Sequence, residues 1–293
     1  MCGAQFGERA SRNGTITDRP PLMSGTLYVV ATPIGNLEDI TLRALRTLRE
    51  VAVIAAEDTR RTARLLGAHA IVTRTVSFHE HNTRSRLPQL LARLANGESI
   101  ALVTDAGTPG ISDPGLELIQ ACLERGFRVD PIPGASAPLT ALMASGLPML
   151  PFTIFGFAPH RSKDRICWLS EVSRTPHTFS FFDSPLRIQS TLAEACQFMV
   201  NRQIVVAREL TKSHQELFAG TAETLLIGRI TKRGEFTVLV GPVREPSDEK
   251  SLPTDADIAW AFGQLVDRGL SRREKTRLIG SQFDVSQDRK SVV

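Results

Sequence analysis

The sequence predicts an α/β protein with two α/β domains and a small C-terminal helical module. In the first half, short apolar runs alternate with amphipathic helical patterns, which is typical of a mostly parallel sheet covered by helices. After about residue 149, more strands and shorter helical stretches indicate a mixed sheet. A stretch at 243–256, rich in proline, serine and charge, then predicts a linker before the helical pattern of 257–293.

The first domain, 25–148, is predicted from five apolar runs and the helical patterns between them. One helix begins near Asp39 and repeats leucine every three residues, and Asp58 is a suitable N-cap for the next. The expected strands are 26–31, 51–57, one within 72–78, 100–103 and 128–134, and the apolar faces of the expected helices are Leu42, Leu45 and Leu48, then Leu87, Leu90, Leu91 and Leu94, then Leu116, Ile119 and Leu123.

The second domain, 149–242, is predicted from five strand-like runs and two helical stretches. The strands are expected within 152–157, 178–184, 203–210, 215–220 and 235–242, and the helices around 162–172 and 185–199. Residues 1–24 lack the apolar core of a secretory signal, so we expect a disordered leader or a mis-set start codon, with Met23 available as an internal start.

Composition excludes some classes of protein. Hydrophobic residues make up 42% of the 293 residues, and no stretch approaches the roughly 18 consecutive apolar residues that a membrane span needs. The net charge of +4 permits a polyanionic partner. The four cysteines, which form no C-x-x-C pair, indicate reduced thiols and a cytoplasmic location: Cys2, Cys122, Cys167 and Cys196.

The loop at 104–115, TDAGTPGISDPG, is the strongest sign of a binding site. It follows the apolar run 100–103, and in α/β sheets ligands bind beyond the carboxyl ends of the strands. Glycines let the backbone approach a ligand closely, and prolines stiffen the same loop. Asp105 provides an acceptor where a ribose or an amino group could be held.

Several common site motifs do not occur. No G-x-G-x-x-G follows the first strand, no glycine loop ends in G-K-[ST], and no G-x-S-x-G is present. His79-Glu80-His81 could offer two metal ligands, but no third ligand lies near in sequence. We therefore expect polar site lining or a strand-end cap there, and no metal.

Successive motifs along the chain resemble those of the tetrapyrrole methylase superfamily, in particular its ribosomal-RNA-methylating branch. They are the segments 29–41, 55–62, 78–82, 102–115 and 131–137, continued in order by 144–148, 156–159, 205–216 and 234–240. The resemblance implies two α/β domains with the methyl donor S-adenosyl-L-methionine in the cleft between them. It also implies 2′-O-methylation of a cytidine ribose in the decoding region of 16S rRNA.

The resemblance implies the residues that hold the methyl donor. The glycine loop would wrap it, the turn after the first strand and the PIPG turn would complete the pocket, and Phe182 would pack on the adenine. These residues are Pro33, Gly35, Asp105, Gly107, Thr108, Pro109, Gly110, Ile111, Ala135, Ser136 and Phe182.

A ribose hydroxyl is a poor nucleophile at neutral pH, so a nearby base would help by roughly 10²–10⁴-fold. Glu57, Asp58 and His79 are the candidates, because each ends a strand or starts a helix near the proposed cleft. Glu57 is the first choice. Its alternative role is a salt bridge to Arg60 or Arg61.

Basic groups along the chain suggest an RNA surface, and one of them comprises His160, Arg161, Lys163 and Arg165. The expected RNA contacts are Arg60, Arg61, His79, Asn82, Arg84, Arg161 and Lys163. The expected partner is 16S rRNA within the 30S subunit. The family further implies a homodimer, and we expect neither membrane nor DNA as a partner.

The chain departs from the family pattern at two positions. Leu186 stands where relatives carry a histidine, and Ala135 stands where proline is usual. Two other functions stay open, and Leu186 favours the second of them. One is a methyltransferase of the same superfamily that acts on a tetrapyrrole or a diphthamide intermediate, and the other is a non-catalytic ribosome assembly factor that binds the methyl donor.

Overall fold

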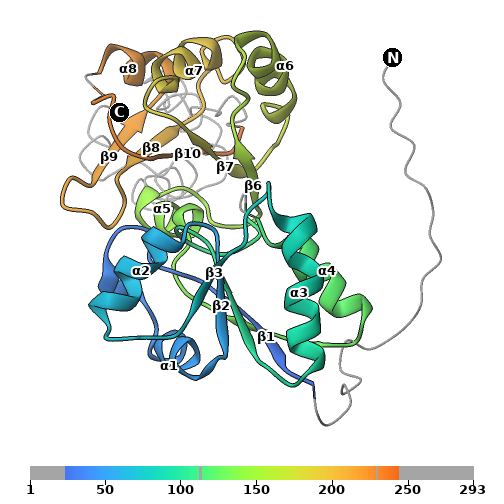
Figure 1. The fold of residues 1–293 in the computed structure, drawn as a ribbon. Coiled ribbons are helices and arrows are strands. Elements are labelled where there is room, and N and C mark those ends of the chain that lie inside the picture. Colours follow the sequence, from blue (N-terminus) through green and yellow to red (C-terminus); the bar gives the residue numbers. More distant parts are fainter. Residues whose placement is uncertain (1–23, 112–113, 229, 244–293) are drawn as a thin grey trace, which may run out of the picture. The chain divides into compact units, whose positions relative to one another are not determined.

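The computed structural model describes residues 24–111, 114–228 and 230–243, and these contain two five-stranded sheets (Figure 1). The first sheet has the strand order β3-β2-β4-β1-β5, and every neighbouring pair in it is parallel. Its strands are β1 (Thr26–Val30), β2 (Val53–Ala56), β3 (Thr75–Ser77), β4 (Ile100–Val103) and β5 (Arg128–Ile132). The predicted parallel sheet is therefore confirmed.

Helices cover both faces of this sheet, because side chains alternate along each strand. Val30, Ile54 and Val103 pack in one core with α1 (Leu42–Glu50) and α2 (Thr59–Ala68). Leu27, Val53 and Leu102 pack in a second core with α3 (Thr83–Ala95) and α4 (Leu116–Glu124). In Figure 1 the two pairs of helices lie on opposite sides of the sheet. A 3₁₀ turn, η1 (Leu37–Asp39), precedes α1.

The expected buried faces of two helices are partly wrong. On α1, Leu42 is 86% exposed while Ala44, Thr47 and Leu48 are buried, because a spacing of three residues drifts about 60° around a helix at each step. On α4 the buried pair is Leu118 and Cys122, and the expected Leu116 and Leu123 are exposed. This helix is apolar on both sides, so spacing alone did not select the buried one. The leucine face predicted for α3 is confirmed at Leu90, Leu91 and Leu94.

The second sheet is mixed, as predicted, with the order β6-β7-β10-β8-β9. Only the β6–β7 pair is parallel in this sheet. Its strands are β6 (Phe152–Phe157), β7 (Thr178–Asp183), β8 (Ile204–Arg208), β9 (Glu216–Gly220) and β10 (Phe236–Val240). Its core packs against α6 (Ser162–Val172), α7 (Ile188–Ala195) and α8 (Ala222–Ile227).

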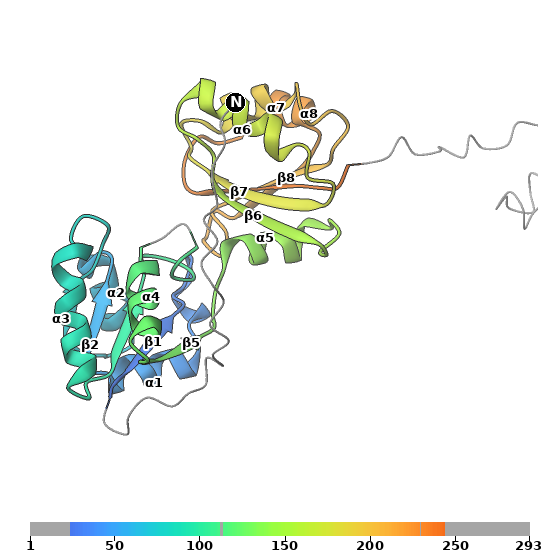
Figure 2. The same cartoon turned by 90° about the vertical axis from the view of Figure 1, so that its right-hand side faces the viewer.

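The helix α5 (Ala137–Ser145) lies on the opposite face of the second sheet from α6, α7 and α8 (Figure 2). Ala141 and Leu142 pack there with Leu239 of β10. The same core includes Ile34, which follows β1, and Leu210, which follows β8. This cluster therefore joins the loop after β1 to the second sheet.

The predicted domain ranges 25–148 and 149–242 each contain one sheet, and the boundary between them remains a prediction. Apart from Ser24 and Val243, the expected leader, linker and helical module lie outside the described residues. No helix in the described part of the chain combines the length and apolarity needed to cross a membrane.

Candidate methyl-donor site

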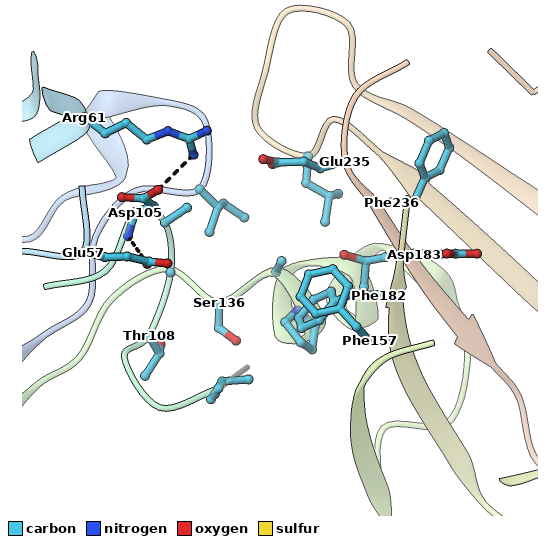
Figure 3. Close-up of a pocket in the computed structure, with 18 residues that line it drawn as sticks. Glu57, Arg61, Asp105, Thr108, Ser136, Phe157, Phe182, Asp183, Glu235 and Phe236 are labelled. Atoms are coloured by element: carbon cyan, nitrogen blue, oxygen red, sulfur yellow. Dashed lines mark hydrogen bonds and ion pairs between the residues drawn. The ribbon is translucent and has the colours of Figure 1, made fainter. Parts of the chain in front are cut away.

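A cavity of about 280 Å³ lies beyond the carboxyl ends of the first sheet's strands (Figure 3). The loops after β2 and β4 line one side, and residues of β6, β7 and β10 line the other. We call it the first cavity. It is lined by Ile34, Glu57, Arg61, Asp105, Ala106, Gly107, Thr108, Ile111, Ser136, Ala137, Pro138, Phe157, Phe182, Asp183, Leu210, Glu235, Phe236 and Thr237.

A network of acidic groups and one arginine forms a polar wall of this cavity. The backbone N–H of Asp105 donates to Glu57 Oε2 at 3.2 Å, and the Asp105 carboxylate pairs with Arg61 at 3.3 Å (Figure 3). The other Asp105 oxygen accepts the backbone N–H of Asp58 at 3.1 Å. These contacts hold the loops after β2 and β4 together. They therefore fix the positions of the Glu57 and Asp105 carboxyl groups relative to each other.

The two acidic residues at the end of β2 differ in electrostatic environment. Burial raises the pKa of the Glu57 carboxyl above its usual value of 4.5, although the hydrogen bond from the Asp105 N–H opposes the shift. Asp58 caps α2, as predicted, and its hydrogen bonds from the Arg60 side chain and backbone lower the Asp58 pKa far below the usual range. Glu57 is therefore the stronger base of the two.

The glycine loop is held against the loop after β1 by paired backbone hydrogen bonds. The N–H of Thr32 donates to the Gly107 carbonyl at 2.8 Å, and the N–H of Gly107 donates back at 3.0 Å. Gly107 has a φ of +82°, which a residue with a Cβ rarely adopts. The Thr108 hydroxyl donates to the Ala135 carbonyl at 3.3 Å and so ties this loop to the turn before α5.

Two phenylalanines form an aromatic wall opposite the glycine loop. The rings of Phe157 and Phe182 lie 5.1 Å apart at an interplanar angle of 47°. They come from the adjacent strands β6 and β7, and both line the first cavity (Figure 3). Sequence reasoning found Phe182 but missed Phe157, although its segment GFAP was among the family motifs.

The predicted donor-binding residues divide into three groups. Asp105, Gly107, Thr108, Ile111, Ser136 and Phe182 line the first cavity. Pro33 and Gly35 line a neighbouring second cavity. Pro109, Gly110 and Ala135 line neither cavity. Sequence reasoning missed the contributions of the second sheet, among them Leu210, Glu235 and Thr237, because strands distant in sequence bring them to the site.

His79 and Asn82 form a local cap at the end of β3. The backbone N–H of His79 donates to Asn82 Oδ1 at 2.9 Å, and Asn82 Nδ2 lies 3.2 Å from His79 Nε2. Neither residue lines either of the two cavities. The strand-end cap considered for this motif is therefore present.

The predicted RNA-contacting cations are exposed. Arg60 has 88% of its side chain exposed although it pairs with Asp58, and Arg84, Arg161 and Lys163 are exposed too. Arg165, grouped with them by sequence, is buried. It makes two hydrogen bonds to the Glu194 carboxylate, at 2.7 and 2.9 Å, and donates to two backbone carbonyls. Arg165 therefore serves the fold and not a charged surface.

The first cavity fits S-adenosylmethionine chemically. The phenylalanine pair offers a flat apolar surface for an adenine, and Glu57 and Asp105 place carboxylates where a sulfonium or ammonium cation would be favoured. The Ser136 hydroxyl, which makes no cap hydrogen bond to α5, remains available for a polar group.

The described residues thus form a parallel sheet, a mixed sheet and a cavity beyond the strand ends, and no Rossmann glycine fingerprint follows the first strand. The family described as Tetrapyrrole (Corrin/Porphyrin) Methylases matches residues 26–226, and the chain belongs to this family. Among solved structures, diphthine synthase has a TM-score of 0.59 at 16% identity, covering 74% of this chain and 90% of that chain. A uroporphyrin-III C-methyltransferase from Thermus thermophilus, complexed with S-adenyl homocysteine, has a TM-score of 0.53 at 18% identity, covering 74% and 97%. At these sequence identities, the two comparisons show a similar fold and nothing more.

Curated relatives are much more similar in sequence. A protein of Halalkalibacterium halodurans is 47% identical over 233 residues, covering 79% of both chains. A protein of Mesorhizobium japonicum is 45% identical, covering 87% of this chain and 88% of its own, and one of Synechocystis is 41% identical, covering 88% and 93%. Each of the three bears the name ribosomal RNA small subunit methyltransferase I.

Proposed function

We propose that this chain transfers the methyl group of S-adenosylmethionine to RNA of the small ribosomal subunit. The observation that carries the proposal is the 41–47% identity, over most of both chains, to three relatives named ribosomal RNA small subunit methyltransferase I. The motif resemblance narrows the acceptor to the 2′-hydroxyl of a cytidine in the decoding region of 16S rRNA. We further propose a cytoplasmic homodimer that acts on the 30S subunit.

The first cavity would hold the methyl donor. Phe157 and Phe182 would contact the adenine, and the backbone around Gly107 and Thr108 would hold the remainder. The bound donor supplies an electrophilic methyl group on a cationic sulfur. The chain's main task is then to align that group with the ribose oxygen, which can contribute roughly 7–11 kcal/mol.

Glu57 is our proposed general base. It lines the cavity, and its pKa is raised, which makes it a better proton acceptor than an ordinary carboxylate. The ribose proton would pass to the Glu57 carboxylate while the oxygen bonds to the methyl carbon. The carbon–sulfur bond breaks in the same step and leaves the neutral thioether. Asp58, with its lowered pKa and its role as a helix cap, is a weaker candidate.

The basic start of α6 is the proposed outer RNA contact. Arg161 and Lys163 are both exposed there. Replacing both with glutamine should weaken RNA binding and reduce the slope of log K against log salt by about 1.4–1.8, roughly 0.7–0.9 for each lost phosphate contact. Filter binding of 16S rRNA fragments at several salt concentrations measures this slope. An unchanged slope would exclude these residues from the RNA contact.

The non-catalytic alternative rested on Leu186. This side chain is 89% exposed and lines neither cavity, so its difference from relatives leaves the lining of both cavities unchanged.

The test of catalysis is methyl transfer from labelled S-adenosylmethionine to purified 30S subunits, with free 16S rRNA and 50S subunits in parallel reactions. We expect label on 30S subunits. Binding of the methyl donor without transfer to any RNA would refute the proposal.

A further inference from the structure

A second cavity, of about 420 Å³, adjoins the first cavity. The loop after β1, the first turns of α2, the start of the loop after β4 and two residues of the second sheet's loops line it. The lining residues are Thr32, Pro33, Ile34, Gly35, Leu37, Arg61, Thr62, Arg64, Leu65, Thr104, Asp105, Ala106, Lys212 and Glu235. We propose that this second cavity receives the acceptor nucleotide of the RNA, an inference that rests on the proposed methyl transfer to RNA.

The two cavities differ in aromatic and charged side chains, and this difference matches the methyl donor in the first cavity and an RNA nucleotide in the second. The first cavity carries the Phe157 and Phe182 rings, which suit a nucleobase of the methyl donor. No aromatic residue is among the described residues that line the second cavity, which instead has three cationic side chains, from Arg61, Arg64 and Lys212. The second cavity also has two carboxylates, from Asp105 and Glu235, so its cations exceed its acids by one. The first cavity has one cation, from Arg61, and four acidic residues: Glu57, Asp105, Asp183 and Glu235. An RNA nucleotide brings a phosphate anion, which the charge of the second cavity suits better.

The three cations are not equally available to a phosphate. Lys212 is held between Glu209, at 2.8 Å, and Glu235, at 3.0 Å, so its charge is already balanced. Arg61 pairs with Asp105. Arg64 is exposed, and no hydrogen bond or ion pair to it is found among the described residues. Since it stands one helical turn after Arg61 on α2, Arg64 is the cation best placed to take the phosphate.

The two cavities share part of their lining, and the proposed methyl transfer would take place beside these shared residues. Five residues line both: Ile34, Arg61, Asp105, Ala106 and Glu235. Two substrates that exchange a methyl group must meet without a layer of protein between them, so their sites must adjoin. Asp105 is one of these shared residues and donates its backbone N–H to Glu57, the proposed base. A ribose in the second cavity would thus approach the donor beside the residue that positions the base.

The test uses the full chain with two variants and one control. Arg64→Gln removes the unpaired cation, and Leu37→Glu adds a negative charge at a half-exposed position that lines only the second cavity. Arg46→Gln, on the exposed side of α1 and in neither cavity, is the matched control. The measurements are KM and kcat for 30S methylation at several salt concentrations, and S-adenosylhomocysteine affinity by calorimetry.

We expect each of the two variants to raise KM for 30S subunits about tenfold, Arg64→Gln because it loses one charge-assisted contact and Leu37→Glu because its carboxylate repels the phosphate. We expect Arg64→Gln also to lower the salt dependence, and S-adenosylhomocysteine affinity to stay within twofold in both. Unchanged KM in both variants, with active wild-type protein, would overturn the inference and leave the proposed function intact. A loss of S-adenosylhomocysteine binding in Leu37→Glu would assign the second cavity to the methyl donor instead. Inactive wild-type protein would instead refute the proposed function.

Discussion

Replacing Glu57 with glutamine separates the proposed base from a structural carboxylate. Glutamine keeps an oxygen that can accept the Asp105 N–H now donated to Glu57 Oε2 at 3.2 Å. Exchanging a charged for a neutral acceptor costs about 1 kcal/mol. Loss of a general base costs roughly 10²–10⁴-fold in rate, which is about 3–5 kcal/mol in activation free energy. A structural role of Glu57 therefore predicts a small loss of stability in the variant, whereas a catalytic role predicts a large loss of methyl-transfer rate.

The raised pKa of Glu57 also predicts how stability and activity depend on pH. Because burial raises the folded-state pKa above 4.5, the stability that Glu57 contributes is present below pH 4.5 and is lost as the pH rises through the raised pKa. Glutamine removes that loss, which offsets the cost of the weaker hydrogen bond, so the variant should unfold close to the wild-type temperature at pH 7. Activity of the wild-type protein should fall as the pH drops through the raised pKa, because the base must be ionised.

The assay is single-turnover methyl transfer with saturating S-adenosylmethionine, together with S-adenosylhomocysteine calorimetry and thermal unfolding. Glu50→Gln, an exposed change at the end of α1 that lines neither cavity, is the control. We expect a rate at least about 10²-fold lower in Glu57→Gln, with S-adenosylhomocysteine affinity and stability retained. A rate within threefold of wild type would remove Glu57 from the mechanism.

Three further predictions follow from the packing. Phe182→Ala should weaken S-adenosylhomocysteine binding about tenfold in calorimetry while Phe182→Tyr should not, and equal affinities would place the adenine elsewhere. Arg165→Met should lower the free energy of unfolding in urea by about 3–5 kcal/mol, since it leaves the Glu194 carboxylate unpaired, and a change below 1 kcal/mol would contradict that role. Burial raises the pKa of the Cys122 thiol to about 12, so iodoacetamide at pH 8 should alkylate the exposed Cys167 first, as peptide mass spectrometry can check.

Much of the fold was predictable because its strands are short apolar runs with clear ends. The alternation of strand and helix gave the parallel sheet, and the loop after β4 pointed to the cavity. The helix α5 was not predicted. It lies against the second sheet with Leu142 and Ala141 buried, but its segment APLTALMAS has no amphipathic period to reveal it. The exposed side of α5 is apolar as well, with Leu139 51% and Met143 77% exposed, so hydrophobic periodicity does not distinguish its two faces.

Apart from Phe182, which the family resemblance supplied, the predicted residues that line the first cavity come from the first domain. Asp105 and Glu57 follow strands that local sequence identifies, and parallel topology brings their loops together. Phe157 and Glu235 come from strands whose position depends on the order β6-β7-β10, which sequence does not specify. The burial of Arg165, which the sequence places in a basic group, was not predictable for a similar reason, because its partner Glu194 lies on another helix, 29 residues away.

The most direct test of the central claim is to map the methylated nucleotide. The 30S subunits would be purified from cells lacking this gene and incubated with the protein and tritiated S-adenosylmethionine, and the labelled nucleotide would be located in the RNA. Label on the ribose of a decoding-region cytidine is the predicted result. Label on a base, on another RNA, or on no RNA while S-adenosylhomocysteine still binds would contradict the account.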